Sequence, residues 1–225
     1  MATKGKGDFP HPPPAARAAL DALAARDSHL AQIEKRAGPL PWRVRPPGFP
    51  GLLQAIVAQQ ISNQAAAAIW RRVAALPGAL EPSGLLGLSE EALRAAGLSR
   101  PKVVHARALA ISFVEGRLEA RALQGMDDEA AIEAIVAIRG MGRWSAEIYL
   151  LFALGRSDVF PSGDLALAAA AAHLLSLPTR PSPTALRAIA EAWRPARGLA
   201  ARLLWHHWRH VTGRPALDDI DASRP

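Results

Sequence analysis

The sequence predicts an all-α protein, and three observations carry that prediction. Alanine is abundant in every segment with helical periodicity, only 5% of the residues are aromatic, and no strand pattern extends beyond a few residues. A chain of 225 residues with 50% hydrophobic content can bury a substantial core, either as one domain or as two small lobes. Glycine and proline punctuate the helical segments, so the elements can be taken in order.

The composition points to a polyanionic partner and excludes several kinds of site. The formal net charge is +7, although charge by itself names no partner. The absence of cysteine excludes disulfides, thiolate zinc sites and cysteine-bound iron–sulfur clusters. The first residues lack the apolar core of a signal peptide, and no apolar run is long enough to cross a membrane. We therefore expect a soluble, cytoplasmic monomer.

The N-terminal part predicts a tail, a helix and a loop. Residues 1–14 contain lysine, glycine and four prolines, which is typical of a flexible tail, and residues 214–225 are expected to form a second tail. Residues 15–37 predict one amphipathic helix, which a glycine–proline pair ends. In the proline-rich loop at residues 39–50, Trp42 is either a packing anchor or a base-stacking residue.

Residues 51–76 predict a long helix that a polar segment interrupts. Apolar residues recur along it at helical spacing, and Pro77 and Gly78 stop it. Its middle reads Ala-Gln-Gln-Ile-Ser at residues 58–62, where polar side chains can break the regular helix. This segment is either a solvated helix face or a site in which Gln60 has a specific role.

Three further helices are predicted at residues 89–96, 99–116 and 128–138. Each begins at a residue suited to capping, such as Ser89 in the first, and the third carries a buried apolar stripe. Lys102 lies on the second helix. Its side chain either belongs to a solvated basic face or contacts a phosphate.

A tight turn joins the third of these helices to the next one. Gly140, Met141 and Gly142 separate the run that ends at Ile138 from a second helical run at residues 144–154. Glycine permits a strained turn and lets a polyanion approach the backbone. The amides that open the second helix have no partner within it, so the turn is a candidate phosphate-binding site.

A single acid follows this helix pair. Pro161, Ser162 and Gly163 lead to Asp164, which starts an alanine-rich helix that continues to about residue 177. The amide donors and the dipole at the start of a helix attract the negative charge of an aspartate at this place. Asp164 is therefore either a catalytic carboxylate or a simple helix cap.

The C-terminal part predicts two more helices, at residues 183–194 and 197–211. His206 and His210 lie one turn apart on the last helix and could share a metal ion. No carboxylate or cysteine lies at a convincing spacing from them, so we expect no metal site, and the roles of these histidines and of His207 stay open.

The residues from the tight turn onward have an order found in a known family. Gly-Met-Gly is followed by Trp-Ser-Ala, then by Asp-Val-Phe-Pro, by Asp164 and by a tryptophan pattern from Trp193 to Trp205. This order resembles the helix-hairpin-helix DNA glycosylase superfamily, and within it the AlkA-like 3-methyladenine DNA glycosylases. The resemblance covers roughly Pro50 to Trp208.

The resemblance implies a two-lobed helical fold with an active-site cleft between the lobes. Residues 15–50 would join residues 164–213 in one lobe, and residues 51–163 would form the central lobe, with the helix-hairpin-helix at 128–154. Because the chain is short and its start is helical, we expect no N-terminal β domain of the kind found in some AlkA proteins.

The resemblance also implies a reaction, in which alkylated bases such as 3-methyladenine are flipped out of double-stranded DNA and excised. Asp164 would be the catalytic residue, while Trp144, Trp205 and Ile148 would line the base pocket, although each tryptophan could equally be core packing. Relatives that also cut the strand carry a lysine where this chain has Trp144, so a monofunctional glycosylase without lyase activity is implied. Gln60 would be the minor-groove wedge that fills the gap left by the flipped nucleotide.

Contacts to the DNA backbone are implied at the hairpin and on a neighbouring helix. The residues concerned are Gly140, Gly142, Arg143, Ser145 and Lys102. No cofactor is required, but the family binds a monovalent cation through hairpin carbonyls, here those of Val136, Ile138 and Met141.

Two other functions remain open. A helix-hairpin-helix module that binds DNA without chemistry would need Gly140 and Gly142 but neither Asp164 nor the aromatic pair. A sister glycosylase for oxidised or mismatched bases is disfavoured by the missing cysteines and by Trp144.

Overall fold

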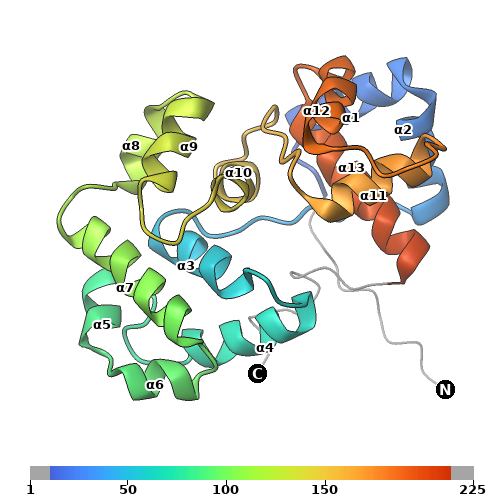
Figure 1. Ribbon diagram of the computed structural model, residues 1–225. Coiled ribbons are helices and arrows are strands. Elements are labelled where there is room, and N and C mark those ends of the chain that lie inside the picture. Colours follow the sequence, from blue (N-terminus) through green and yellow to red (C-terminus); the bar gives the residue numbers. More distant parts are fainter. Residues whose placement is uncertain (1–10, 214–225) are drawn as a thin grey trace. The chain divides into compact units, whose positions relative to one another are not determined.

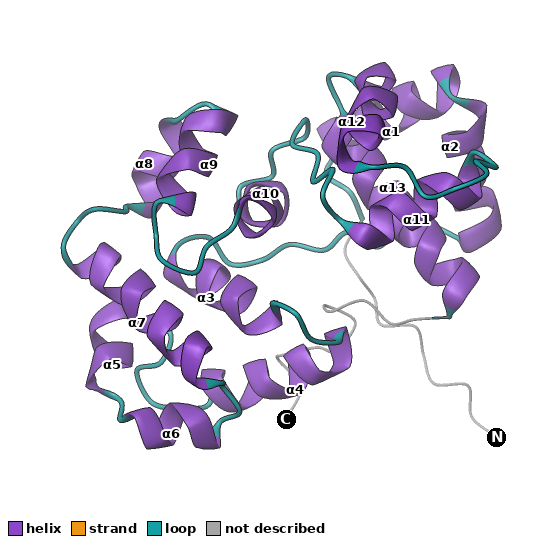
Figure 2. Cartoon of the chain, in the orientation of Figure 1, coloured by secondary structure: helices purple, strands orange, loops and turns teal. Residues whose placement is uncertain are grey.

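A computed structural model describes residues 11–213, and every regular element in this range is a helix (Figures 1 and 2). The prediction of an all-α protein is confirmed. The predicted tail at 214–225 and the first ten residues of the predicted tail at 1–14 lie outside the described range. Among the described residues, no helix is both long and apolar enough to cross a bilayer.

The helices are short and follow one another closely along the chain. In order they are α1 (Pro14–Arg26), α2 (Ser28–Ala37), α3 (Phe49–Ala58), α4 (Asn63–Ala74), α5 (Pro82–Gly87), α6 (Glu90–Ala95), α7 (Arg100–Val114), α8 (Ala120–Gly125), α9 (Asp128–Val136), α10 (Arg143–Phe152), α11 (Leu165–Leu174), α12 (Pro183–Ala190), the 3-10 helix η1 (Glu191–Trp193) and α13 (Arg197–Thr212).

The chain divides into two units, each with its own packing. The described part of one, which we call the terminal unit, consists of residues 11–43 and 160–213. The other, the central unit, consists of residues 44–159. Both ends of the described chain therefore belong to the same unit.

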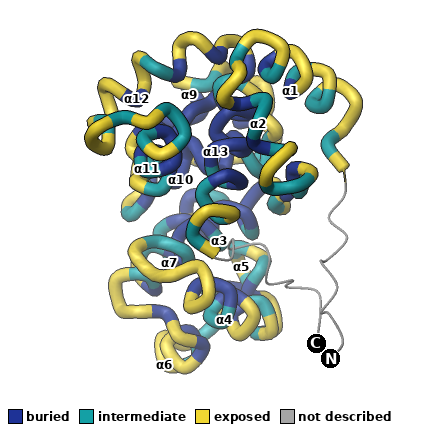
Figure 3. The backbone as a smooth tube through the Cα atoms, turned by 90° about the vertical axis from the view of Figure 1, so that its right-hand side faces the viewer, coloured by how far each residue is buried: buried dark blue, intermediate teal, exposed yellow. Residues whose placement is uncertain are grey.

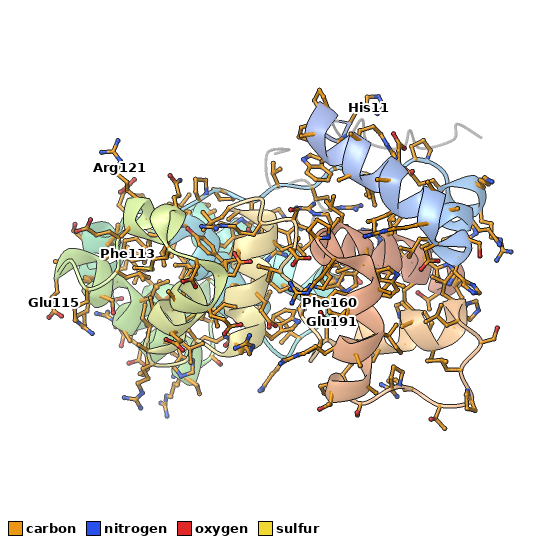
Figure 4. All side chains as sticks on the ribbon, turned by 90° about the horizontal axis from the view of Figure 1, so that it is seen from above. His11, Phe113, Glu115, Arg121, Phe160 and Glu191 are labelled. Atoms are coloured by element: carbon orange, nitrogen blue, oxygen red, sulfur yellow. The ribbon has the colours of Figure 1, made fainter. Side chains whose placement is uncertain are left out.

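The central unit is built around α3, α7 and α10. Leu53, Leu109 and Leu150 are fully buried members of its core, and Figure 3 shows α10 largely in the colour of buried residues. Phe49 packs edge-on against Phe113 with ring centroids 5.6 Å apart. Figure 4 shows Glu115 and Arg121 pointing outward from this unit, as expected for charged side chains on its surface.

The terminal unit packs α13 against α2 and α11. Trp193 is 2% exposed, and its indole donates a 2.7 Å hydrogen bond to Asp27, which caps α2. The guanidinium of Arg202 lies 4.3 Å from the ring centroid of Trp42. Trp42 therefore packs within this unit, in agreement with the packing alternative for it.

Two predicted single helices are in fact pairs. The helix predicted at residues 15–37 was wrong as one element, because Asp27 adopts an extended backbone and its carboxylate accepts the amides of His29 and Leu30 at 2.9 and 3.0 Å. The helix predicted at residues 51–76 is interrupted at residues 59–62, the polar segment at which a break was foreseen. The short helices α5 and α8 were not predicted.

Candidate functional site

The hairpin turn between α9 and α10 requires a glycine at its first position. Gly140 has φ +88°, in the left-handed region that other residues rarely adopt. A Cβ atom built on Gly140 would lie 2.1 Å from Cγ of His105, a residue of α7. His105 therefore packs directly against the turn and leaves no room for a side chain there.

The second glycine of the turn, Gly142, is required neither by its backbone conformation nor by a neighbouring side chain. Gly142 caps α10 with φ −100°, and a Cβ on it would meet no atom within 4 Å. Gly142 and Arg143 are both exposed, so the first amides of α10 lie beside open space. This is the geometry in which a helix N-terminus can receive a phosphate.

Arg143 is bound by two carboxylates of the central unit. Its guanidinium donates both to Glu129 of α9 and to Glu147 one turn along α10, at 3.0 Å for the latter. These contacts raise the pKa of Arg143, and the hydrogen bond that it donates to Glu129 has the largest effect. Because the side chain of Glu147 is only 5% exposed, Arg143 compensates a buried charge as well as joining the two helices.

Two other residues predicted to contact the DNA backbone have partners within the protein. Ser145 is buried, and its Oγ atom accepts a 3.2 Å hydrogen bond from Nε2 of Gln59. Lys102 donates from Nζ to the carbonyl of Val57 near the end of α3, at 2.6 Å, and burial lowers the pKa of Lys102. These bonds give both residues a role in holding the central unit together.

Gln60, the predicted wedge, lies at the tip of the turn between α3 and α4. It is exposed and has φ +56°, one of two non-glycine residues with positive φ in the described chain. Ile61 beside it is 37% exposed. A side chain held outward in a sparsely populated conformation is a feature of functional sites.

Asp164 lies in the terminal unit and its carboxylate is fixed by two donors. The Oδ1 atom accepts the amide of Leu167 at 2.8 Å, which caps α11, and the indole Nε1–H of Trp205 at 3.2 Å. The connection before it is itself fixed, since Arg187 donates to the buried Ser162. The structure therefore brings Asp164 and Trp205 together.

This arrangement occurs twice in the terminal unit. Asp27 also caps a helix and also accepts an indole N–H, that of Trp193. A capping aspartate with a tryptophan donor is therefore not by itself a catalytic arrangement. What distinguishes Asp164 is its place in the ordered motif that follows the hairpin.

The other two predicted base-pocket residues belong to α10 in the central unit. Trp144 is half-buried in the first turn of the helix, whereas Ile148 is buried. Next to Ile148, Tyr149 is buried, and its hydroxyl oxygen accepts the amide N–H of Gly48 at 2.8 Å. Tyr149 is thus a core residue of this unit.

The histidines of α13 are explained by packing. His206 donates from Nε2 to the carbonyl of Gly38 at 2.9 Å, and His207 Nε2 lies 3.0 Å from Nδ1 of His173. Residues 11–213 contain no group of three or more side chains placed to hold a metal ion.

Sequence reasoning missed three residues that organise the hairpin: Gln59, His105 and Glu147. Each is polar and lies among apolar residues at helical spacing, where it reads as a solvated position. Gln59 and His105 both contact Gly140, which is distant from them in sequence, so no local pattern could have identified them. Glu147 lies four residues after Arg143 on the same helix, and this spacing was the only local signal for its role.

Comparisons with known proteins agree on one family. A family model described as "HhH-GPD superfamily base excision DNA repair protein" matches residues 53–195. DNA-3-methyladenine glycosylase 1 of Schizosaccharomyces pombe is 30% identical over 158 residues, which cover 68% of this chain and 69% of that protein.

Two solved structures are also similar over most of their length. The 3-methyladenine DNA glycosylase of Schizosaccharomyces pombe in complex with abasic DNA gives a TM-score of 0.77 at 26% identity, covering 85% of this chain and 95% of that one. A DNA-3-methyladenine glycosidase from Bacillus halodurans gives 0.73 at 33% identity, covering 89% and 94%.

Proposed function

Because the chain belongs to the HhH-GPD superfamily of base excision DNA repair proteins, we propose that it is a DNA glycosylase for alkylated bases. It flips 3-methyladenine and related lesions out of duplex DNA and hydrolyses the N-glycosidic bond. Relatives named as 3-methyladenine glycosylases support this substrate class, and a relative in complex with abasic DNA supports the DNA partner.

The observation that carries the chemistry is the fixed carboxylate of Asp164. Departure of the base leaves an oxocarbenium-like sugar, which a nearby anion stabilises, and the same carboxylate can orient or deprotonate the attacking water. The amide of Leu167 and the indole of Trp205 hold Oδ1 in place before the substrate arrives. Preorganised charge of this kind needs no rearrangement at the moment of reaction.

The duplex is held through its backbone at the start of α10. Here neutral amides and the helix dipole attract the phosphate, with open space over Gly142. Gln60 enters the minor groove and fills the gap, and its amide can hydrogen-bond the base left without a partner. Flipping costs a few kcal/mol, and a damaged, poorly stacked base reduces that cost.

Base recognition rests on aromatic contact. An alkylated purine with a positive charge is attracted to an indole face by about 0.5 to 2 kcal/mol. Trp144 is half-buried and so presents part of its surface. Neither Trp144 nor Ile148 carries an amine, so no Schiff base forms at these positions, and the product is an intact strand with an abasic site. Some members of the family carry a tyrosine where this chain has Ile148, and the loss of that ring and hydroxyl widens the range of accepted lesions.

A monovalent cation would be held by the carbonyls of Val136, Ile138 and Met141. The carbonyl of Ile138 already accepts the amide of Met141 at 3.0 Å, and a carbonyl oxygen has a second lone pair for a cation. The bound cation would add positive charge beside the phosphate.

We also place the protein in the cytoplasm, and with the nucleoid if the cell is bacterial, because the nucleoid holds the DNA that is its proposed substrate.

The decisive experiment is single-turnover excision from duplexes that each carry one lesion, with 3-methyladenine-like and 1,N6-ethenoadenine substrates. Asp164→Asn removes the charge but keeps an oxygen for both donors and remains a good helix cap. We expect base release by the wild type without strand cleavage before alkali. The variant should lose about 10²-fold or more in rate while retaining duplex affinity.

The control is Asp27→Asn, because Asp27 also caps a helix and also accepts an indole N–H, although it binds the amides through Oδ1 and the indole through Oδ2. Its excision rate should stay near that of the wild type. If wild type binds duplex DNA but releases no base from any lesion, the protein is a non-catalytic DNA-binding module. If Asp164→Asn excises normally, Asp164 is a helix cap only.

A further inference from the structure

Gln59 connects two parts of the central unit that contact DNA in the proposed function. Its Nε2 atom donates to the carbonyl of Gly140 at 2.9 Å and to Oγ of Ser145 at 3.2 Å. Gly140 belongs to the hairpin turn and Ser145 to the first turn of α10. A single amide group thus joins the turn between α3 and α4 to both sides of the phosphate-binding position.

The same region rests on one face of α7. Lys102 donates to the carbonyl of Val57 at 2.6 Å, close to the end of α3, and His105 packs against Gly140. Lys102 and His105 are three residues apart and so share a helix face. The end of α3 and the hairpin turn are therefore supported by the same helix and linked to each other by Gln59.

The residue that follows this link is the exposed Gln60. Its φ of +56° is unfavourable for a residue with a side chain and persists only where the surroundings determine it. The contacts of Gln59 and Lys102 on the N-terminal side of the turn provide that constraint, and Ser62 caps α4 on the other side.

We propose that Gln59 is a positioning residue that couples the wedge at Gln60 to the hairpin. Phosphate binding at α10 fixes Gly140 and Ser145, and through Gln59 it fixes the turn that carries Gln60. Backbone binding and insertion of the wedge are then one event. This inference rests on the proposed function, because it assumes that the turn enters DNA. Gln59 itself touches no reacting atom.

The test uses stopped-flow fluorescence of a duplex with 2-aminopurine beside a single 1,N6-ethenoadenine. The signal rises when the lesion leaves the stack, before any excision. Gln59→Leu keeps the size of the side chain and removes both N–H donors. We expect the fluorescence of 2-aminopurine to rise about tenfold more slowly with Gln59→Leu than with the wild type. The thermal midpoint of unfolding is measured in parallel to detect a loss of stability. The matched control is Gln124→Leu, a substitution of an exposed glutamine in α8 that should leave the rise unchanged.

The coupling itself is read from a double variant. Gln60→Ala should also slow the rise, and because both substitutions act through one wedge, Gln59→Leu/Gln60→Ala should be no slower than the slower single variant. The proposal is overturned if the two losses multiply, or if Gln59→Leu lowers the thermal midpoint and leaves the rise unchanged. A rise without base release would instead refute the proposed catalysis and leave the coupling measurable.

Discussion

The two glycines of the hairpin turn look equivalent in the sequence but serve different ends. Gly140 is required by its positive φ and by the imidazole of His105 packed against it. Gly142 has an ordinary φ and faces open space. One glycine therefore serves the fold, and the other leaves room for a ligand.

Alanine at each position separates these roles. Gly140→Ala should lower the free energy of unfolding by about 2 kcal/mol or more, because the new methyl group is both strained and in collision with His105. Gly142→Ala should change it by less than about 0.5 kcal/mol but weaken duplex binding several-fold, because the methyl group occupies the space over the amides. Chemical denaturation and a DNA-binding titration measure the two effects. Equal losses of stability would contradict this division.

At the scale of elements, the sequence predicted most helices within a few residues. The hairpin helices were expected at residues 128–138 and 144–154 and lie at Asp128–Val136 and Arg143–Phe152. Capping residues and apolar spacing are local signals, so they could be read directly. The six-residue helices α5 and α8 are too short to show any periodicity, and tertiary packing stabilises them instead.

The break between α1 and α2 shows what local signals could not supply. The apolar spacing of Leu20, Leu23, Leu30 and Ile33 runs through it without a change. The break depends on Asp27, whose second carboxylate oxygen is bound by Trp193, 166 residues further on. Only the folded terminal unit makes this position a helix start.

Asp27→Ala should therefore destabilise the protein by more than the loss of an ordinary cap. We expect about 2 to 3 kcal/mol, since the cap and the buried indole N–H both lose their partner. Ser89→Ala removes one capping bond, to Ala92, and should cost about 1 kcal/mol. Urea unfolding of the two variants side by side tests the difference. Equal values would mean that the indole contact contributes nothing.

At the scale of the whole molecule, the sequence predicted the family correctly but did not predict the hydrogen bonds that position the candidate site residues. Asp164 as the cap of α11 was a local prediction, because Leu167 is three residues away. The bond from Trp205 spans 41 residues and that from Gln59 to Gly140 spans 81, so spacing could not predict either geometry. The resemblance to the family indicated Trp205 as a site residue, but it did not indicate the hydrogen bond from Trp205 to Asp164. It did not indicate Gln59 at all.

The pair formed by His173 and His207 makes the stability of the protein depend on pH. Burial, followed by the neighbouring charge of His173, lowers the pKa of His207 to about 4. The unfolded chain takes up a proton near pH 6.5, whereas the folded protein does so only near pH 4. Stability should therefore fall by about 2 kcal/mol between pH 7 and pH 5 through this group.

His207→Gln should remove that part of the pH dependence, because glutamine can still bind His173 but takes up no proton. His210→Gln changes an exposed histidine on the same helix and should leave the dependence intact. The free energies of unfolding of the wild type and of the two variants, measured at pH 7 and at pH 5, test this prediction. The same slope in all three would show that His207 is protonated in the folded protein.

The division of the chain also sets the order in which it can fold on the ribosome. Residues 44–159 are contiguous, so the central unit can fold as soon as it emerges. Helices α1 and α2 are made first, yet their apolar faces are covered by α13, the last described helix to be made. Until α13 has been made, the apolar faces of α1 and α2 lack the helix that covers them in the folded protein.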